Sequence, residues 1–411
     1  MPFADAVDFQ EGPGIMAYDF QPEGVPLIRL AGLEKGRNLL DGCNYLDPAK
    51  VAAKWSHFRL AVGDVLLSTS ASLGRTAVVP SAAAGAVAYT GIIRMRPRDG
   101  RLHPAFIPYM LESPHFQRQV EAMGAGSVLR HFGPSHLRHM TAVLPPLPEQ
   151  KRIAHILGTL DDKIELNRRM CQTLEEMARA LFKSWFVDFD PVRAKAEGRQ
   201  PAGMDAATAA LFPDSFVDSK LGPIPEGWEV RSLGDEFEVT MGQSPPGQTY
   251  NSNGDGLPFY QGRADFGFRF PALRIYCTAP TRLANKGDTL LSVRAPVGDL
   301  NVALFNCAIG RGVAALRHRS GAASYTYHSL QAHQDDLLLF EANGTVFGSV
   351  SGKELAAVRL VAPPDVLAKQ FATAVGPLDD EIENRTVQSQ GLANARDALL
   401  PRLLGREERQ G

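Results

Sequence analysis

The residues of this chain that could do chemistry are cations and amides placed in glycine-bounded loops. The densest group runs from Ser127 to His139, directly after a Gly-Ala-Gly stretch, and contains Arg130, His131, His136 and Arg138. Arginine pairs well with guanine edges in the major groove, whereas cations and backbone amides also bind phosphates. This group predicts a DNA contact. A solvated loop followed by a helix start explains it equally well.

Other basic and amide residues offer the same chemistry singly. Arg75 lies in the loop after a Gly-Asp strand, and Arg94 alternates with apolar residues, as a solvent-facing strand edge would. Arg294 takes the matching loop place in the second half of the chain. For each of them an ordinary surface residue is the alternative. The candidates in the second half are Gln243, Gln261, Arg263, Arg294, Arg311 and Lys353.

Catalytic chemistry is not indicated. A DNA methyltransferase needs a polar side chain before its Pro-Pro pair, but Leu144 and Ala362 hold that place in the two Pro-Pro pairs of this chain. There is no Walker-type nucleotide-binding loop and no Ser/His/Asp nucleophile pattern. The acid pairs beginning at Asp161 and Asp379 fall on expected helices, where solvated flanks or partner contacts explain them. We therefore expect no enzyme activity, no cofactor and no metal.

The distribution of charge is uneven, although the net charge of the 411 residues is only −2. Residues 30–147 carry 13 Lys and Arg against 7 Asp and Glu, whereas residues 222–364 are near balance with 12 against 13. A chain of this type is not basic enough to hold DNA alone, so help from a partner's basic surface is expected. Four cysteines without a C-x-x-C pair, and no signal peptide or apolar run of membrane length, predict a soluble cytoplasmic protein.

These candidate residues belong to an internal repeat. The stretch Gly63–Ser68 returns as Gly287–Ser292, and Gly126–Val128 returns as Gly344–Val346. Further along, Pro145-Pro146, Leu160–Asp162 and Ala180-Leu181 recur 218 residues later. Matches in one order at nearly one offset predict a duplicated architecture.

Each copy consists of two parts. The first part is rich in Gly and Pro and is predicted to form a compact mixed α/β unit with a twisted sheet, and the second part is a long helix. From residue 149 to 186 apolar residues alternate at spacings of three and four without a proline, and the helix would span about 55 Å. The second helix is polar at Arg385 and Ser389, and Gly376-Pro377 is expected to break or kink it. The expected seam residues are Ile153, Leu160, Ile164, Asn167, Leu174, Leu181, Trp185, Leu378, Ile382, Arg385, Leu392 and Leu399.

The predicted fold is mixed α+β, with two tandem α/β recognition domains and two long helices in an antiparallel coiled coil with pseudo-twofold symmetry. The domains would then sit at the ends of a fixed spacer, and DNA half-sites on one face recur at about 34–36 Å or multiples of it. The predicted boundaries are 1–147 for the first domain, 148–190 for the first helix, 191–221 for a linker, 222–364 for the second domain and 365–411 for the second helix.

Several motifs together resemble the specificity (S) subunits of Type I restriction-modification enzymes, over almost the whole chain. They are Leu147–Ile153 after Pro145-Pro146, Leu160–Glu165 with Asn167, Ala180–Phe189, Leu221–Trp228 and Arg396–Leu404. The second helix departs from the pattern, because Pro363-Pro364-Asp365 lacks the Glu-Gln of the first copy.

The resemblance implies a non-catalytic subunit in which each target recognition domain reads one half of a bipartite, asymmetric sequence of double-stranded DNA. It also implies that the helices set the unread gap and dock two methyltransferase (M) subunits, and that endonuclease (R) subunits join for cleavage. A coiled-coil scaffold that binds only protein is the alternative that composition leaves open.

Overall fold

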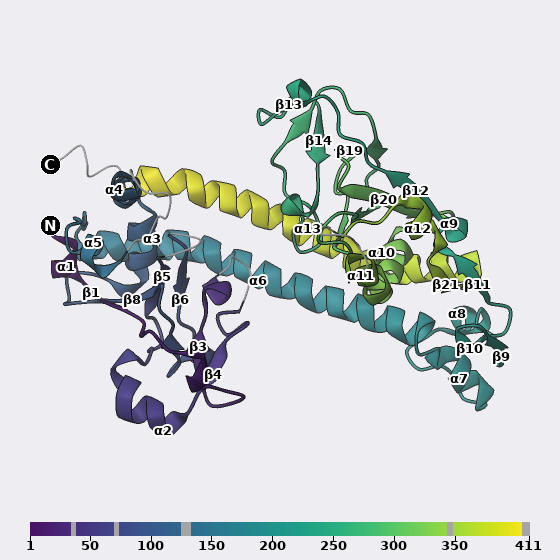
Figure 1. Ribbon diagram of the computed structural model, residues 1–411, viewed down its shortest axis with the longest axis horizontal. Coiled ribbons are helices and arrows are strands. Elements are labelled where there is room, and N and C mark those ends of the chain that lie inside the picture. Colours follow the sequence, from purple (N-terminus) through teal and green to yellow (C-terminus); the bar gives the residue numbers. More distant parts are fainter. Residues whose placement is uncertain (34–37, 70–73, 125–132, 343–347, 405–411) are drawn as a thin grey trace. The chain divides into compact units, whose positions relative to one another are not determined.

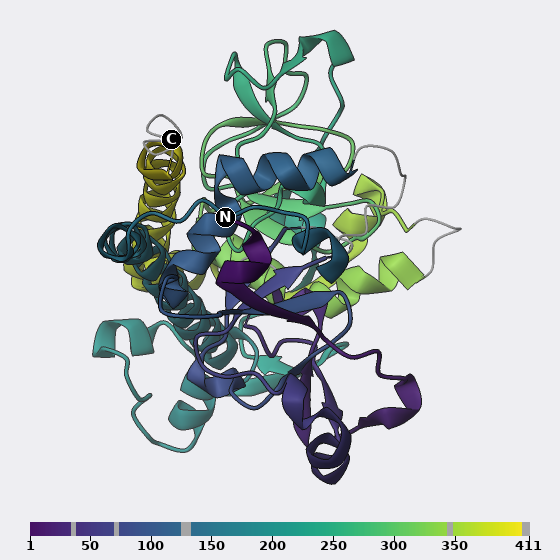
Figure 2. The ribbon, with the colours of Figure 1, turned by 90° about the vertical axis from the view of Figure 1, so that its left-hand side faces the viewer.

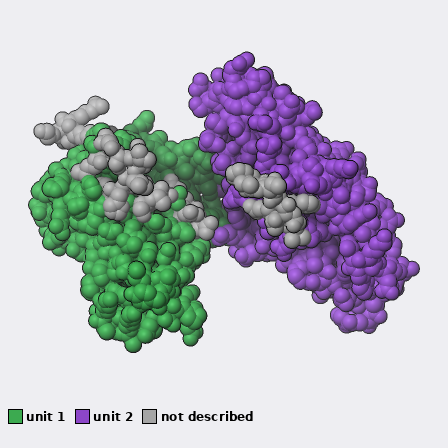
Figure 3. Space-filling view, in the orientation of Figure 1, with its two compact units in different colours: residues 1–169, 386–411 green, residues 170–385 purple. Residues whose placement is uncertain are grey.

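The computed structural model describes residues 1–33, 38–69, 74–124, 133–342 and 348–404. The chain forms two compact units, shown in separate colours in Figure 3. Unit 1 comprises Met1–Arg169 with Thr386–Gly411, and unit 2 comprises Met170–Arg385. Each unit contains a globular domain together with a stretch of both long helices. In the described part of the chain, no helix is long and apolar enough to cross a membrane.

Unit 1 contains two four-stranded sheets. The first is antiparallel, and its strand β5 is buried along its whole length because Val65–Leu67 is an uninterrupted apolar run. The second sheet is mixed, since β3 pairs with β7 in parallel. In sheet order the strands are β1 (Val7–Glu11), β8 (Ile92–Pro97), β5 (Val65–Ser68) and β6 (Thr76–Val78), then β2 (Phe20–Gln21), β4 (Asn44–Leu46), β3 (Val25–Ile28) and β7 (Val87–Ala88).

Unit 2 repeats both sheets in the same strand order and adds one strand, β16, to the second. In sheet order the strands are β12 (Phe237–Met241), β20 (Val313–His318), β17 (Thr289–Ser292) and β18 (Leu300–Val302), then β13 (Tyr250–Asn251), β15 (Tyr276–Cys277), β14 (Leu257–Tyr260), β19 (Cys307–Ile309) and β16 (Leu283–Ala284). Two further ribbons pair β11 (Glu229–Ser232) with β21 (Arg359–Ala362), and β10 (Gly222–Pro225) with β9 (Phe216–Ser219).

Equivalent side-chain contacts accompany the equivalent strands. Arg96 binds Asp64 in unit 1, and Arg317 binds Asp288 in unit 2 at 2.7 Å. Both aspartates follow the repeated glycine at the start of β5 and β17, and both also accept a backbone N–H three residues earlier in the chain. The internal repeat predicted from the sequence is thus confirmed in the topology of the two sheets.

Two helices of 40 residues dominate the ribbon, α6 (Leu147–Phe186) and α13 (Asp365–Leu404) (Figure 1). Gly376-Pro377, expected to break or kink the second helix, does not break it, because α13 runs through both residues. Proline removes one backbone donor there, but Phe371, Val375 and Ile382 are fully buried on either side. Their burial offsets the lost hydrogen bond.

The helices pair antiparallel within each unit. In unit 1, Asp161 of α6 binds Arg396 of α13 at 2.7 Å, and six residues further along α6 Asn167 binds Ser389. In unit 2, Cys171 lies against Ile382 and Trp185 against Phe371. In these contacts the residue number increases along α6 while it decreases along α13, so the helices run in opposite directions. Both views of the ribbon show the C-terminal part of α13 beside α6 (Figures 1 and 2). The predicted antiparallel pair is confirmed.

Shorter helices complete the two cores. They are α1 (Phe3–Ala6), α2 (Pro48–Lys50), α3 (Ile107–Glu112), α4 (Pro114–Gly124) and α5 (Pro134–Leu137) in unit 1, and α7 (Asp190–Ala196), α8 (Ala206–Ala210), α9 (Leu233–Glu236), α10 (Ala323–Ala332), α11 (Gln334–Ala342) and α12 (Gly352–Ala357) in unit 2. The segment expected as a linker, 191–221, is folded, since its residues Val192 and Phe212 are 0% and 2% exposed in the core of unit 2.

The core of unit 2 contains a histidine that makes its stability depend on pH. Burial, aided by the nearby Arg269 cation, lowers the pKa of His328 from 6.5 to about 3. Protonation therefore favours the unfolded chain, so the contribution of His328 is constant above pH 6.5 and becomes destabilising as pH falls below that value. At one pH unit below 6.5 the loss is about 1.4 kcal/mol.

We expect His328→Leu to reduce the drop in unfolding free energy between about pH 7.5 and about pH 5.5 by about 1.4 kcal/mol. Urea unfolding followed by tryptophan fluorescence measures the drop for each protein, and replacement of the exposed His139 by leucine is the control. An equal drop in the His328 variant and the parent protein would contradict the assignment.

Candidate nucleic-acid interface

Four chain segments of unit 2 meet at the turn between β19 and β20, which consists of Gly310, Arg311 and Gly312. The N–H of Gly310 donates to the carbonyl of Tyr260 at 2.8 Å, and the N–H of Gly312 donates to that of Gln261 at 3.1 Å. The carbonyl of Gly312 accepts from Val293 at 3.0 Å. The ends of β12, β14 and β17 therefore converge on this turn, which we call the unit 2 junction.

Glycine is required at the junction because the backbones approach too closely for a side chain. A Cβ added to Gly312 would lie 2.4 Å from the carbonyl oxygen of Gln261, and one added to Gly242 would lie 2.2 Å from that of Gly310. The three glycines thus let the loops lie against one another. Small residues at such points bring the polar residues that follow them into one neighbourhood.

The sequence-predicted residues Gln243, Gln261, Arg294 and Arg311 are all exposed and follow these converging segments. The N–H of Gln243 donates to the carbonyl of Ile309 at 3.0 Å, and Arg311 donates its N–H to Ser244. Two amides and two guanidinium groups at one junction supply the donors and acceptors that base edges and phosphates require. The structure brings these four residues together.

Arg263 lies two residues beyond Gln261 and forms an ion pair with Asp299 at 2.7 Å. Both side chains remain partly exposed, at 52% and 37%. Lys353 is exposed on α12, the helix that follows the strand-like contact of Ser349 with Arg294. These two cations flank the junction.

Unit 1 builds the same junction with other side chains. Gly12 corresponds to Gly242, because each follows the first strand of its sheet and donates its N–H to the first residue of β8 or β20, Ile92 or Val313, at 2.9 Å. A Cβ on Gly12 would lie 2.0 Å from the carbonyl oxygen of Ala88. The turn is formed by Tyr89, Thr90 and Gly91, where Tyr89 donates its N–H to Ile28 and Gly91 accepts from Thr69. In place of Gln261 this junction has Arg29, whose guanidinium carbon lies 4.1 Å from the centroid of the Tyr89 ring.

The described residues predicted for unit 1 do not come together at one place as those of unit 2 do. Arg75 is half-buried just before β6. On α5 and directly after it, His136 is half-buried and Arg138 is exposed. The segment that follows α5 accepts a backbone hydrogen bond from Phe3, which precedes β1. Strands β1 and β6 form opposite edges of the sheet. Arg130 and His131 lie outside the described residues.

One interpretation of a single arginine is wrong. Arg94 is not on a solvent-facing strand edge, since it is 7% exposed on β8, a central strand, and binds Asp8 at 2.8 Å. Burial lowers the pKa of Arg94. Arg294 lies in the loop after β17, which matches the loop of Arg75 after β5. Within these loops the residue equivalent to Arg75 is Asp299, because each donates its N–H to the serine that ends β5 or β17.

Sequence reasoning missed Arg29 and Arg282. Arg282 is exposed, its carbonyl accepts from Ile309, and the neighbouring Thr281 donates its hydroxyl to the carbonyl of Gln243 at 2.8 Å. It therefore belongs to the unit 2 junction. The pairing of β16 with β19 places it there, and no local sequence pattern signals that pairing.

The predicted seam residues vary in burial. Asn167, fully buried, donates to Gln388 at 2.8 Å and to Ser389 at 3.2 Å, which forms a polar layer between the helices of unit 1. Gln150, near the start of α6 and outside the predicted seam, is also fully buried. Its side-chain amide forms hydrogen bonds with three backbone groups. Ile153, Asn167, Trp185 and Ile382 are buried, and Leu160, Ile164, Leu174, Leu181, Leu378, Arg385, Leu392 and Leu399 are half-buried.

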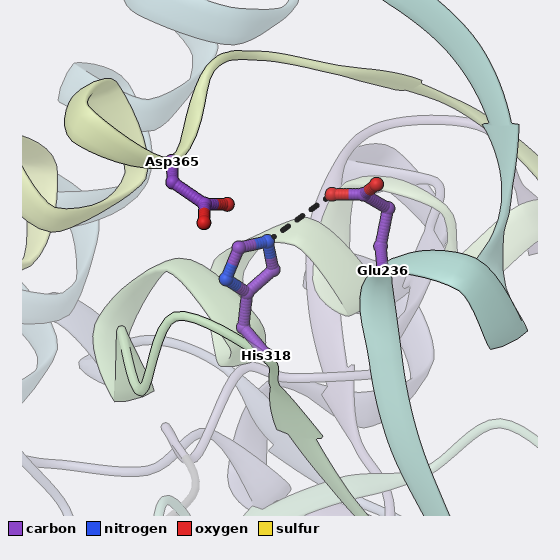
Figure 4. Close-up of side chains that lie close together, drawn as sticks. All are labelled: Glu236, His318 and Asp365. Atoms are coloured by element: carbon purple, nitrogen blue, oxygen red, sulfur yellow. Dashed lines mark hydrogen bonds and ion pairs between the residues drawn. The ribbon is translucent and has the colours of Figure 1, made fainter.

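Glu236, His318 and Asp365 of unit 2 offer ligand atoms within 4.8 Å of one another (Figure 4). Nδ1 of His318 accepts from the backbone N–H of Ser320 at 3.2 Å, so Nε2 carries the proton and donates to Glu236 at 3.3 Å. Arg231 binds the other oxygen of Glu236 at 2.9 Å. Both ring nitrogens of His318 thus have protein partners, and the hydrogen bond between His318 and Glu236 joins β20 to α9.

Comparison with known proteins identifies one family. The model described as the Type I restriction modification DNA specificity domain matches residues 50–176 and 225–390, one range in each half of the repeat. A relative from Methanocaldococcus jannaschii that carries the name type I restriction enzyme MjaX specificity subunit is 28% identical over 395 residues, 93% of this chain and 86% of its own length. The HindI specificity subunit of Haemophilus influenzae is 25% identical, over 64% of this chain and 68% of its own.

A solved structure shares the fold. The S subunit of a type I restriction-modification system from M. genitalium covers 98% of this chain and 95% of its own, with 16% identity and a TM-score of 0.57.

Proposed function

Because the chain belongs to the Type I restriction-modification DNA specificity family, we propose that each of its two domains reads one half of a bipartite DNA sequence. The observation that carries this proposal is the duplicated junction. The same loops converge in both units, but Gln261 and Arg311 stand in unit 2 where Arg29 and Thr90 stand in unit 1. Because the two junctions share one backbone arrangement but carry different hydrogen-bonding side chains, the two domains are expected to recognise different half-site sequences.

In this proposal Arg311, Arg294, Gln261 and Gln243 contact DNA from unit 2, with Arg263, Arg282 and Lys353 beside them. Side chains with a fixed fork or amide geometry read bases, whereas flexible cations bind phosphates at any sequence. In unit 1 we assign the corresponding role to Arg29 and Thr90. Arg75, His136 and Arg138 remain predictions for DNA contacts from unit 1.

Partner subunits supply the catalysis. Specificity is the function that the names of the relatives share, and we propose that two methyltransferase subunits dock on the helical region and that endonuclease subunits join them in the cytoplasm. The helix pair would set the number of unread base pairs between the half-sites. The family membership disfavours the alternative of a coiled-coil scaffold that binds only protein.

Exchange of one domain tests the proposal. A chimaera in which residues 1–147 come from a relative is expected to change one half of the methylated sequence and leave the other half and the spacer unchanged. Sequencing of methylated adenines in cells that carry the partner subunits gives both halves directly. A change in both halves, or no sequence preference in the parent complex, would overturn the proposal.

A further inference from the structure

A buried arginine ties the globular domain of unit 2 to both long helices. Arg269 is 4% exposed, and its two terminal nitrogens bind Glu175 of α6 at 2.8 Å and Asp379 of α13 at 2.7 Å. Its guanidinium carbon lies 3.6 Å from the centroid of the Tyr327 ring on α10. Ser324 donates to the second oxygen of Asp379. One side chain thus joins three helices.

The segment that carries Arg269 also carries Gln261, one of the exposed residues of the unit 2 junction, and Arg263 beside it. It leaves β14 at Gln261, continues through the short 3-10 turn Arg263–Asp265 and reaches Arg269 a few residues later. Gly267 and Asn301 exchange two hydrogen bonds, of 2.9 and 3.0 Å, and the carbonyl of Arg269 accepts from Val302 at 2.8 Å. These bonds hold the segment against β18, so the helix contact and the junction are mechanically connected.

The repeat contains a related contact at equivalent positions. In unit 1, Asp161 of α6, which corresponds to Asp379 of α13, accepts from the Tyr109 hydroxyl at 2.8 Å and from Arg396 at 2.7 Å. Tyr109 on α3 corresponds in turn to Tyr327 on α10. Each unit therefore seats its domain on a repeated aspartate of the helices, through the Tyr109 hydroxyl in unit 1 and the Arg269 guanidinium in unit 2.

A two-carboxylate contact of this kind is directional. Arginine holds two carboxylates in a planar fork that apolar packing of the same volume does not reproduce, and buried ion pairs often add more to specificity than to stability. Adjacent base pairs are separated by about 3.4 Å along the DNA axis. They are rotated about that axis by roughly 35° relative to each other, given about ten base pairs per turn. A domain that reads DNA from a helical spacer must be held to within these values.

We propose that Arg269 is a positioning residue that fixes the unit 2 domain on the helix pair and thereby restricts recognition to one spacer length. This inference rests on the proposed function. Loss of the fork lets the domain tilt on the apolar remainder of its contact with the helices. Half-sites one base pair closer or further apart then become acceptable, while the sequence of each half-site is still read by the unchanged junction.

The test is a methylation map of cells that carry the partner subunits with either the parent chain or Arg269→Met. We expect Arg269→Met to retain both half-site sequences and to raise methylation at spacers one base pair longer or shorter by at least tenfold. Arg269→Lys, which supplies a single point charge, is expected to give a smaller rise. Arg274→Met is the control, because Arg274 is exposed on the same segment and binds Asp265 rather than the helices.

The outcomes separate this inference from the proposed function. A purely structural role would lower methylation at all sites without changing the spacer, and that result overturns the inference, as does a change in one half-site sequence. If Arg269→Met fails to accumulate, Glu175→Gln and Asp379→Asn each weaken one arm of the fork, and unchanged spacers in both overturn it equally. A parent complex that methylates no bipartite sequence overturns the proposed function as well.

Discussion

Replacement of Phe371 by alanine is expected to lower the free energy of unfolding of unit 2 by about 3–5 kcal/mol. The side chain is fully buried on α13 and its ring contacts Phe182, Trp185 and Phe186 of α6 edge-on, with centroids 5.4 to 5.9 Å apart. Alanine would leave a cavity between the two helices, because aromatic neighbours on a rigid helix cannot collapse into the space. Chemical unfolding followed by tryptophan fluorescence, to which Trp185 and Trp228 contribute from unit 2, measures the change.

Val366 provides the matched control for this prediction. It lies on the same helix, five residues earlier, and is 50% exposed. Val366→Ala is expected to change the unfolding free energy by less than about 0.5 kcal/mol. Similar losses in the two variants would mean that the helix pair is not held by the aromatic cluster.

Replacement of Arg311 by alanine is expected to weaken binding of the assembled complex to its DNA target by about 1–3 kcal/mol, which is roughly 5- to 150-fold. The residue is exposed at the tip of the unit 2 junction, between two glycines that keep its turn close to Gln261. The loss is expected for the correct half-site and not for a scrambled one, because a base contact is lost only where the base is present. Competition binding with both duplexes at one salt concentration measures the ratio.

Arg359→Ala removes the same charge from an exposed side chain at the start of β21. It is expected to leave the ratio between correct and scrambled half-sites unchanged. If Arg311→Ala weakened both duplexes equally and reduced the salt dependence, Arg311 would bind phosphate rather than a base.

The first long helix and the internal duplication could be predicted from the sequence, because each follows from a residue pattern that is local or repeated along the chain. The heptad spacing around Ile153 and Trp185 predicts α6, since an amphipathic helix needs one apolar side regardless of its partner. The matches around Asp64 and Asp288 predict a duplication, and the structure shows both aspartates bound to equivalent arginines. Local rules were insufficient at Pro377, where tertiary burial outweighs the cost of a helical proline.

The candidate site was only partly predictable. Exposed arginines beside glycines in unit 2 were found, because glycine marks close backbone approach and the cation stands out next to it. Arg29 and Arg282 were missed because their places at the junctions depend on which strands pair. Arg94 was misjudged because the exposure of a strand residue depends on what covers each face of the sheet: it alternates with apolar residues as an exposed residue would, yet Ile92–Met95 of β8 are buried on both faces.

The sequence by itself determined the duplication, the two long helices and the absence of catalytic motifs, since these follow from spacing along the chain. Only the tertiary structure decided which loops converge at the two junctions and that Arg269 reaches Glu175 and Asp379. The physical reason is that a hydrogen bond or ion pair between residues about a hundred positions apart depends on the path of the backbone between them. No local pattern of residue types encodes that path.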